Sequence, residues 1–142
     1  MRRTSILLCT AMALLMPVPA VADEGGLAIV VHPARPAALD TDDVARIFLR
    51  KRRFWDDGAP IVALNREPGT AARMTFSRRV LHADPAQLHA YWDQQYFAGI
   101  FPPTVLSSGA AVKRYVAADR DAIGYLEWSE VDDSVRVVLK VE

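Results

Sequence analysis

The sequence from residue 27 onward alternates short apolar runs with segments of helical periodicity, and this alternation constrains the fold more than any other feature. Leu27–Val31 is a continuous run rich in β-branched residues that ends at a His-Pro pair, as is typical of a buried strand. Ile61–Leu64 and Ala122–Leu126 predict two further strands, and alternating apolar and charged residues over 135–141 predict a half-exposed final strand. Strands that alternate with helices predict an α/β fold, in which a mostly parallel or mixed sheet is flanked by helices.

Helices are predicted between these strands, because residues that favour helix N-termini precede apolar residues at helical spacing. The expected caps are Asp40 or Thr41, Asp84 followed by Pro85, and Ser107 or Ser108, while a loop over 66–69 precedes the remaining helix. Each predicted helix has one face of apolar residues, and these faces are, in chain order, Val44, Ile47 and Phe48; Ala72, Phe76 and Val80; Leu88, Tyr91, Trp92 and Tyr96; and Val112, Tyr115 and Val116. We expect Trp55, Trp92 and Trp128 to be anchored in the core.

The first 22 residues have the parts of a secretory signal peptide. Arg2 and Arg3 precede the apolar run 6–16, and the small-residue sequence Ala-Val-Ala over 20–22 forms a cleavage site before Asp23. The run is shorter than the roughly 20 residues that a helix needs to cross a bilayer, although an uncleaved membrane anchor is the alternative. The sequence therefore predicts export to the periplasm, a signal peptide over 1–22 and a single domain over 23–142.

Composition excludes several kinds of protein. The chain has 142 residues with 17 basic and 17 acidic side chains, so it lacks the excess of positive charge that a nucleic-acid-binding protein needs. Its single cysteine, Cys9, falls within the predicted signal peptide. The remaining chain would then have no disulfide, catalytic thiol, cysteine zinc site or iron–sulfur cluster. A domain of this length can be stable on its hydrophobic core alone.

Three motifs together resemble the phosphate-type periplasmic substrate-binding proteins of ABC transporters. Arg46–Leu49 with Phe54–Gly58 resembles their IFLGK…W…DG segment, with Arg50 in place of the glycine. Asn65–Arg73, followed by Phe76, resembles their RxDGSGTRxxF loop and helix start, and Ala122–Tyr125 resembles their GAIGY strand. The motifs occur in the family's order across about 80 residues. The resemblance implies a PBP-like domain, here short enough to be one lobe of a type II periplasmic binding protein.

The resemblance implies a binding site for phosphate or a similar oxyanion at the start of the helix that follows the loop. The residues that it assigns to this site are Arg66, Gly69, Thr70, Ala71, Ala72 and Arg73. A helix N-terminus presents unpaired backbone N–H groups and a positive dipole end to an anion, and two arginines can add charge-assisted hydrogen bonds. Pro68 stands where the family has an aspartate, and Ala72 where it has a threonine. The backbone donors do not depend on these side chains. Alternatively, both arginines pair with surface carboxylates and Thr70 is simply a helix cap.

Other patterns carry less chemistry. His32, His82 and His89 have no cysteine beside them and no metal-binding spacing, so we expect no metal site and no cofactor. The sequence Ser-Ser-Gly over 107–109 lacks the setting of a hydrolase nucleophile. The basic run Arg50–Arg53 reads as a solvated helix end, with contact to a membrane headgroup or an acidic partner as alternatives.

These observations support three hypotheses about function. The first is a periplasmic solute-binding-like protein, not an enzyme, that binds phosphate or a similar oxyanion and delivers it to, or senses it for, an inner-membrane transporter partner. The second is a degenerate PBP-like lobe that acts as a periplasmic protein-interaction or sensory module without a ligand. The third is an unrecognised hydrolase.

Overall fold

A computed structural model describes residues 25–142 of the chain, and the predicted signal peptide lies outside these residues. The elements along the chain are β1 (Leu27–Val31), α1 (Thr41–Phe48), β2 (Val62–Arg66), α2 (Ala71–Arg79), α3 (Pro85–Phe97), β3 (Thr104–Leu106), α4 (Gly109–Ala118), β4 (Ala122–Glu127), a 3₁₀ turn (Trp128–Glu130) and β5 (Arg136–Val141). Among residues 25–142, no helix combines the length and the apolar character needed to span a membrane.

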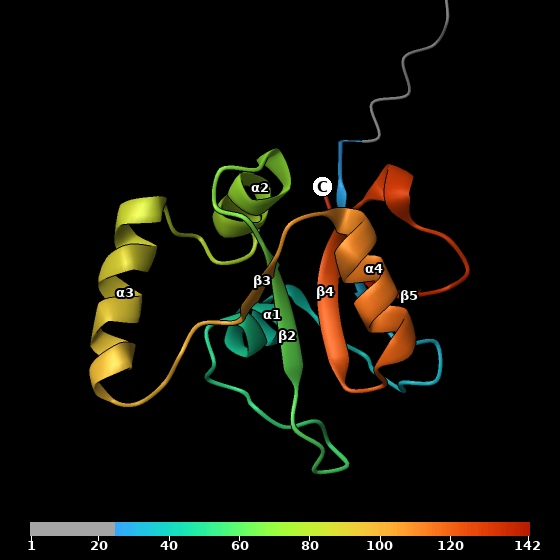
Figure 1. Cartoon of the computed structure of the whole chain (residues 1–142), viewed down its shortest axis with the longest axis horizontal. Coiled ribbons are helices and arrows are strands. Elements are labelled where there is room, and N and C mark those ends of the chain that lie inside the picture. Colours follow the sequence, from blue (N-terminus) through green and yellow to red (C-terminus); the bar gives the residue numbers. More distant parts are fainter. Residues whose placement is uncertain (1–24) are drawn as a thin grey trace, which may run out of the picture.

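The five strands form one mixed sheet in the order β3-β2-β4-β1-β5 (Figure 1). β2 runs parallel to β3 and β4, whereas β1 runs antiparallel to β4 and β5. All five residues of β1 are buried, as expected for a strand at the centre of a sheet that is covered on both faces. The predicted α/β class with a mixed, helix-flanked sheet is therefore confirmed.

Helices cover both faces of the sheet. On one face, Phe48 of α1 and Phe76 of α2 pack on Tyr125 of β4, and the Phe76 and Tyr125 rings are stacked with centroids 4.1 Å apart. On the other face, Val112 and Val116 of α4 pack on the apolar side chains of the central strands. Helix α3 stands beyond the β3 edge of the sheet (Figure 1). The core thus fixes α2 and β4, which carry two of the three motifs, against each other.

Side-chain caps set the starts of the four helices. Asp40, Thr70, Asp84 and Ser108 each accept a hydrogen bond from the backbone N–H three residues later, at 2.8, 3.3, 2.8 and 3.0 Å. Each bond satisfies a donor that has no partner inside the helix. The predicted helix starts are confirmed, with Asp40 rather than Thr41 and Ser108 rather than Ser107 as the caps.

The structure differs from the sequence expectations at several apolar residues and at one strand. β3 was not predicted; it follows two prolines and pairs with β2 at the edge of the sheet. Tyr115 was expected to share a helix face with Val112 and Val116, but it is 40% exposed because α4 buries the narrower stripe of Gly109, Val112 and Val116. Trp55 is buried as expected, whereas Trp92 and Trp128 are half-buried at the margins of the core.

Candidate functional site

The loop between β2 and α2 is an exposed turn that is closed by its own hydrogen bonds. Glu67, Pro68 and Gly69 are all exposed to solvent. The Thr70 N–H donates to the carbonyl of Glu67 at 3.1 Å, and the Thr70 hydroxyl donates to the same carbonyl at 2.8 Å. The Thr70 Oγ1 in turn accepts from the Arg73 N–H. Thr70 therefore both closes the turn and caps α2.

The first two residues of α2 leave their backbone donors free. Among residues 25–142, neither Ala71 nor Ala72 has an acceptor for its N–H. A cavity of about 200 Å³ opens beside these two alanines, and its other walls are formed by Gly25, Gly26, Leu27, Thr75, Glu127 and Ser129. Unpaired N–H groups at the positive end of a helix attract negatively charged oxygens. The start of α2 can thus donate two hydrogen bonds to one oxyanion.

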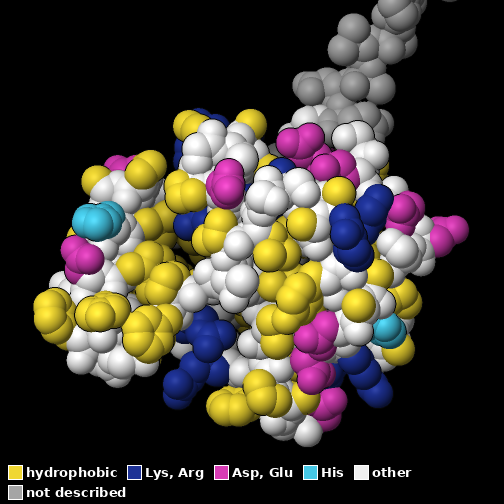
Figure 2. Space-filling model, viewed as in Figure 1, with side chains coloured by type: hydrophobic (Ala, Val, Ile, Leu, Met, Phe, Trp, Pro, Cys, Tyr) yellow, Lys and Arg dark blue, Asp and Glu magenta, His cyan; other side chains and the backbone are white. Residues whose placement is uncertain are grey.

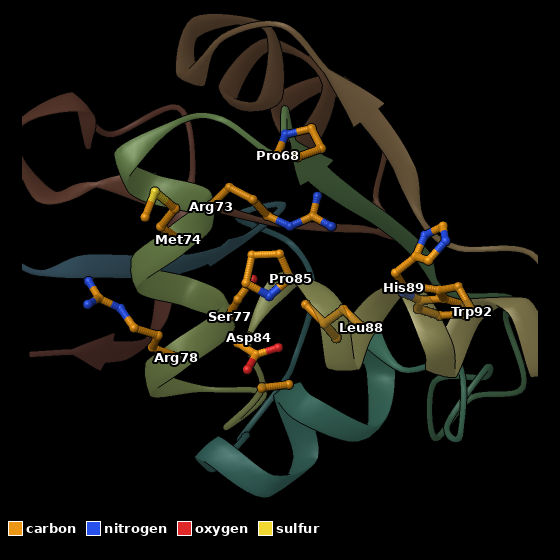
Figure 3. A pocket seen from close by; sticks show the side chains of 11 residues that line it. Pro68, Arg73, Met74, Ser77, Arg78, Asp84, Pro85, Leu88, His89 and Trp92 are labelled. Carbon is orange, nitrogen blue, oxygen red and sulfur yellow. The ribbon is translucent and has the colours of Figure 1, made fainter.

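Arg73 extends from α2 toward the end of β2. Figure 3 shows its side chain crossing beneath Pro68, and its Nη1 donates to the backbone carbonyl of Arg66 at 2.7 Å. Burial lowers the pKa of the guanidinium, and the neighbouring Tyr125 acts in the opposite direction. One nitrogen of the guanidinium is thus bonded to the backbone, and the Arg73 side chain lines the groove between α2 and α3.

The Arg66 guanidinium has different neighbours. Successive side chains of a strand point to opposite faces, and Arg66 shares the α4 face of β2 with Leu64, whereas Asn65 faces Tyr125. Arg66 is 8% exposed, and its Nη1 lies 3.7 Å from Oε2 of Glu130. Neither its Nε nor its Nη1 has a hydrogen-bond acceptor within the described chain.

Glu130 places its carboxylate between Arg66 and the start of α4. A side-chain carbon added at Gly109, the first residue of α4, would overlap the Glu130 carboxylate. The Glu130 Oε2 also accepts from the Glu127 N–H at 3.1 Å. An internal carboxylate therefore occupies a position where a buried cation and a helix N-terminus meet, which is a suitable environment for any anion.

The structure brings together most of the residues that the sequence assigned to an anion site. Gly69, Thr70, Ala71, Ala72 and Arg73 form the turn and the first turn of α2. The Arg66 backbone joins them through its carbonyl, while its guanidinium contacts Glu130 on the opposite face of the sheet. Their role as ligands stays a prediction.

A buried polar pair that the sequence analysis missed supports the turn from below. The Tyr125 hydroxyl donates to Oδ1 of Asn65 at 2.5 Å, and the Arg66 N–H donates to both Asn65 Oδ1 (3.0 Å) and the Tyr125 oxygen (3.1 Å). Burial raises the pKa of Tyr125 to about 12. The pair fixes the end of β2 against β4, and a tyrosine inside an apolar strand is the one sequence signal that could have indicated it.

An apolar groove of about 340 Å³ separates α2 from α3 next to this site (Figure 3). Its walls are formed by Pro68, Arg73, Met74, Ser77, Arg78, Ala83, Asp84, Pro85, Leu88, His89 and Trp92. No group of three His, Cys, Asp or Glu side chains able to hold a metal ion occurs within residues 25–142.

Comparison with known proteins shows the family and the fold of the chain. The family model described as the PBP superfamily domain matches residues 15–139. A search of the curated proteins finds no significant match. Among solved structures, the chain is similar to a Clostridium perfringens protein described as a phosphate ABC transporter substrate-binding protein with bound phosphate. The identity is 27% and the TM-score 0.66, over 80% of this chain and 44% of that one.

A second solved structure shows the same fold at lower identity. The ABC-type phosphate transport receptor from Vibrio cholerae has a TM-score of 0.65 and 22% identity, over 80% of this chain and 45% of that one. The chain thus spans less than half the length of these two proteins, and its mixed five-stranded sheet corresponds to a lobe of a phosphate-binding protein. The chain belongs to the family of the PBP superfamily domain.

Proposed function

We propose that the chain is a periplasmic solute-binding-like protein that binds phosphate or a similar oxyanion at the turn before α2. In this proposal residues 1–22 are a signal peptide that is cleaved before Asp23, and residues 23–142 are the exported domain. The protein delivers the anion to, or senses it for, an inner-membrane partner related to phosphate ABC transport. It is a binding protein and not an enzyme, in keeping with the substrate-binding proteins that it resembles.

The observation that carries the proposal is the pair of N–H groups at Ala71 and Ala72, which have no acceptor in the part of the chain that the structure describes. They lie at the start of a nine-residue helix and beside an open cavity, whereas the Arg73 side chain lines the groove between α2 and α3. The C. perfringens relative was solved with bound phosphate, which supports the same chemistry for this chain. Because the turn is exposed, the anion would stay in contact with water, so we expect an affinity weaker than that of a fully enclosed site.

The second candidate function is that of a protein-interaction or sensory module without a ligand. Tyr96, Phe97 and Phe101 are 63, 89 and 60% exposed at and just after the end of α3, and the Tyr96 ring packs nearly perpendicular to each of the other two. Large exposed aromatic side chains are common where another protein binds. The pairing of Arg66 with Glu130 also favours this alternative, because it withdraws one expected anion ligand.

Isothermal titration with phosphate, sulfate and arsenate tests the proposal. The informative variant is Ala71→Pro, which removes one free N–H while keeping the helix. Proline is favoured at the first helical position, and Thr70 already has the extended backbone (φ −81°, ψ 147°) that a residue before proline requires. We expect an unchanged melting temperature and phosphate binding weakened by about tenfold.

The matched control is Thr41→Pro, which introduces proline at the first position of α1, away from the turn. It should leave phosphate binding unchanged. Absence of binding by the unmodified protein up to about 1 mM phosphate would favour the interaction module instead. If the Ala71→Pro variant binds phosphate as strongly as the unmodified protein, the oxyanion binds elsewhere in the molecule.

A further inference from the structure

The four basic residues after α1 have three different environments. Arg52 forms ion pairs with Asp43 and Asp56, at 3.4 and 3.0 Å. Lys51 is exposed. Arg50, which is half-buried, and Arg53, which is exposed, both line a cavity of about 330 Å³ between their own segment and the loop that leads into β3. Figure 2 shows basic side chains beside hydrophobic ones to the right of the lower end of α3. Within this run, Arg50 and Arg53 therefore differ from Lys51 and Arg52 in lining a cavity.

Arg50 occupies a backbone position that normally takes glycine. It follows the C-cap of α1 with φ 61°, while its N–H donates to Ile47 and the Lys51 N–H donates to Arg46, at 3.0 and 2.8 Å. This is the Schellman arrangement, in which the left-handed residue is usually glycine because a Cβ is strained there. Arginine at this position destabilises the end of α1. This cost points to a further role for the Arg50 side chain.

The cavity matches a ligand that is partly anionic and partly apolar. The Nε of Arg50 is buried without a hydrogen-bond acceptor, and neither Arg50 nor Arg53 has an ion-pair partner among residues 25–142. No acidic residue of the described chain lines the cavity. The remaining walls are mostly apolar: Ile61, Val62, Ala63, Gly99, Ile100, Phe101, Pro102, Pro103 and Thr104. Uncompensated guanidinium groups beside apolar walls favour a carboxylate or phosphate head that carries an apolar body.

The cavity is also distinct from the proposed oxyanion turn. It adjoins Val62 and Thr104, where β2 and β3 begin, whereas the turn follows Arg66 at the other end of β2. On β2, the lining residue nearest to the turn is Ala63, which lies three residues, or about 10 Å, before Arg66. One wall of the cavity is held in position because the Tyr91 hydroxyl of α3 donates to the carbonyl of Leu49 at 2.6 Å.

We propose that this cavity is a second binding site, for a small organic anion whose head pairs with Arg50 and Arg53 and whose apolar body lies against Ile100 and Phe101. A 330 Å³ cavity is large enough for a small molecule with one ring or a short chain. Inorganic phosphate lacks the apolar body and binds this cavity more weakly. The proposal is independent of oxyanion binding at the turn before α2.

The test is a titration of the ¹⁵N-labelled protein with phenyl phosphate, inorganic phosphate and phenol at millimolar concentrations, followed by amide chemical shifts. Phenyl phosphate should change the amide chemical shifts of Ile100, Phe101 and Thr104. It should also bind there more tightly than inorganic phosphate or phenol. The decisive variant is Arg50→Gly, which relieves the backbone strain. It should raise the melting temperature by about 3 °C and weaken phenyl phosphate binding at the cavity by at least about tenfold.

The matched control is Lys51→Ala, which removes an adjacent positive charge that does not line the cavity. It should leave the binding nearly unchanged. Absence of shifts at the cavity residues, equal binding by the Arg50→Gly variant, or equal weakening by Lys51→Ala would each overturn the proposal. Shifts at Ala71–Arg73 report on the oxyanion turn instead, so the two sites can fail separately.

Discussion

The Glu130 Oε2 lies 3.7 Å from Nη1 of Arg66, so a carboxylate of this chain faces the most buried cation near the proposed anion site. The two residues are 64 positions apart and come from the end of β2 and the 3₁₀ turn after β4. Glu130 is partly exposed, at 32% of its side chain, whereas the Arg66 side chain is 9% exposed. The Arg66 charge has less contact with water than the Glu130 charge, so it depends more on this ion pair.

Glu130→Gln should reduce stability and make it more dependent on phosphate. Neutralising the carboxylate leaves a buried guanidinium without its counter-charge, at a cost of about 1 kcal/mol for a partly exposed pair. Added phosphate should restore part of that loss, because the guanidinium can then pair with an oxyanion. Thermal unfolding with phosphate, or with chloride at equal ionic strength, measures the effect. Asp133→Asn, at an exposed acid of the same loop, is the control. Equal behaviour of both variants would show that the pair contributes nothing.

Gly124→Ala should destabilise the fold by about 1–3 kcal/mol. Gly124 is a buried residue of β4, and a Cβ there would overlap Cγ1 of Val112 in α4. Val112 is β-branched and fully buried, so it cannot turn aside. Chemical denaturation measures the loss. Gly69→Ala is the matched control, because Gly69 has open space around it and a Cβ there should change stability by less than about 0.5 kcal/mol. A similar loss in both variants would contradict this explanation.

Tyr125→Phe should make the free energy of unfolding less dependent on pH at alkaline pH. Burial raises the pKa of Tyr125 to about 12 in the folded protein, above the ordinary value of 10.0. Between these values the phenol is neutral when folded and ionised when unfolded, so stability is present below pH 10 and is lost as the pH rises toward 12. Phenylalanine cannot ionise and removes this loss. Urea unfolding measured from pH 8 upward tests it, with exposed Tyr96→Phe as the control. If Tyr125→Phe shows the same loss of unfolding free energy at alkaline pH as the unmodified protein, this would be evidence against a buried neutral phenol.

The sequence predicted those parts of the fold that depend on local patterns. Capping residues and apolar periodicity are local properties, which is why the starts of α1, α2, α3 and α4 and the central strands β1 and β4 were found. β3 was missed because it is three residues long and mostly exposed, and because it exists through parallel pairing with a strand some 40 residues earlier. Such pairing leaves no periodic signal in so short a segment.

The candidate site was predictable in its backbone but less so in its side chains. A helix start after Gly69 follows from the sequence, and so do its unpaired N–H groups. The direction of Arg66 could not be predicted, because it depends on the register of β2 and on which face of the sheet α4 covers. Its partner Glu130 is brought near by the folding of β4 and the turn after it, and the sequence contains no signal that pairs these two residues.

The most direct test of the account is a crystal structure of the protein soaked in arsenate, with data collected at the arsenic absorption edge. We predict an anomalous peak at the start of α2, with an arsenate oxygen within about 3 Å of the Ala71 and Ala72 amide nitrogens. A well-ordered turn without a peak, or a peak elsewhere in the molecule alone, would contradict the proposal that this helix start binds oxyanions.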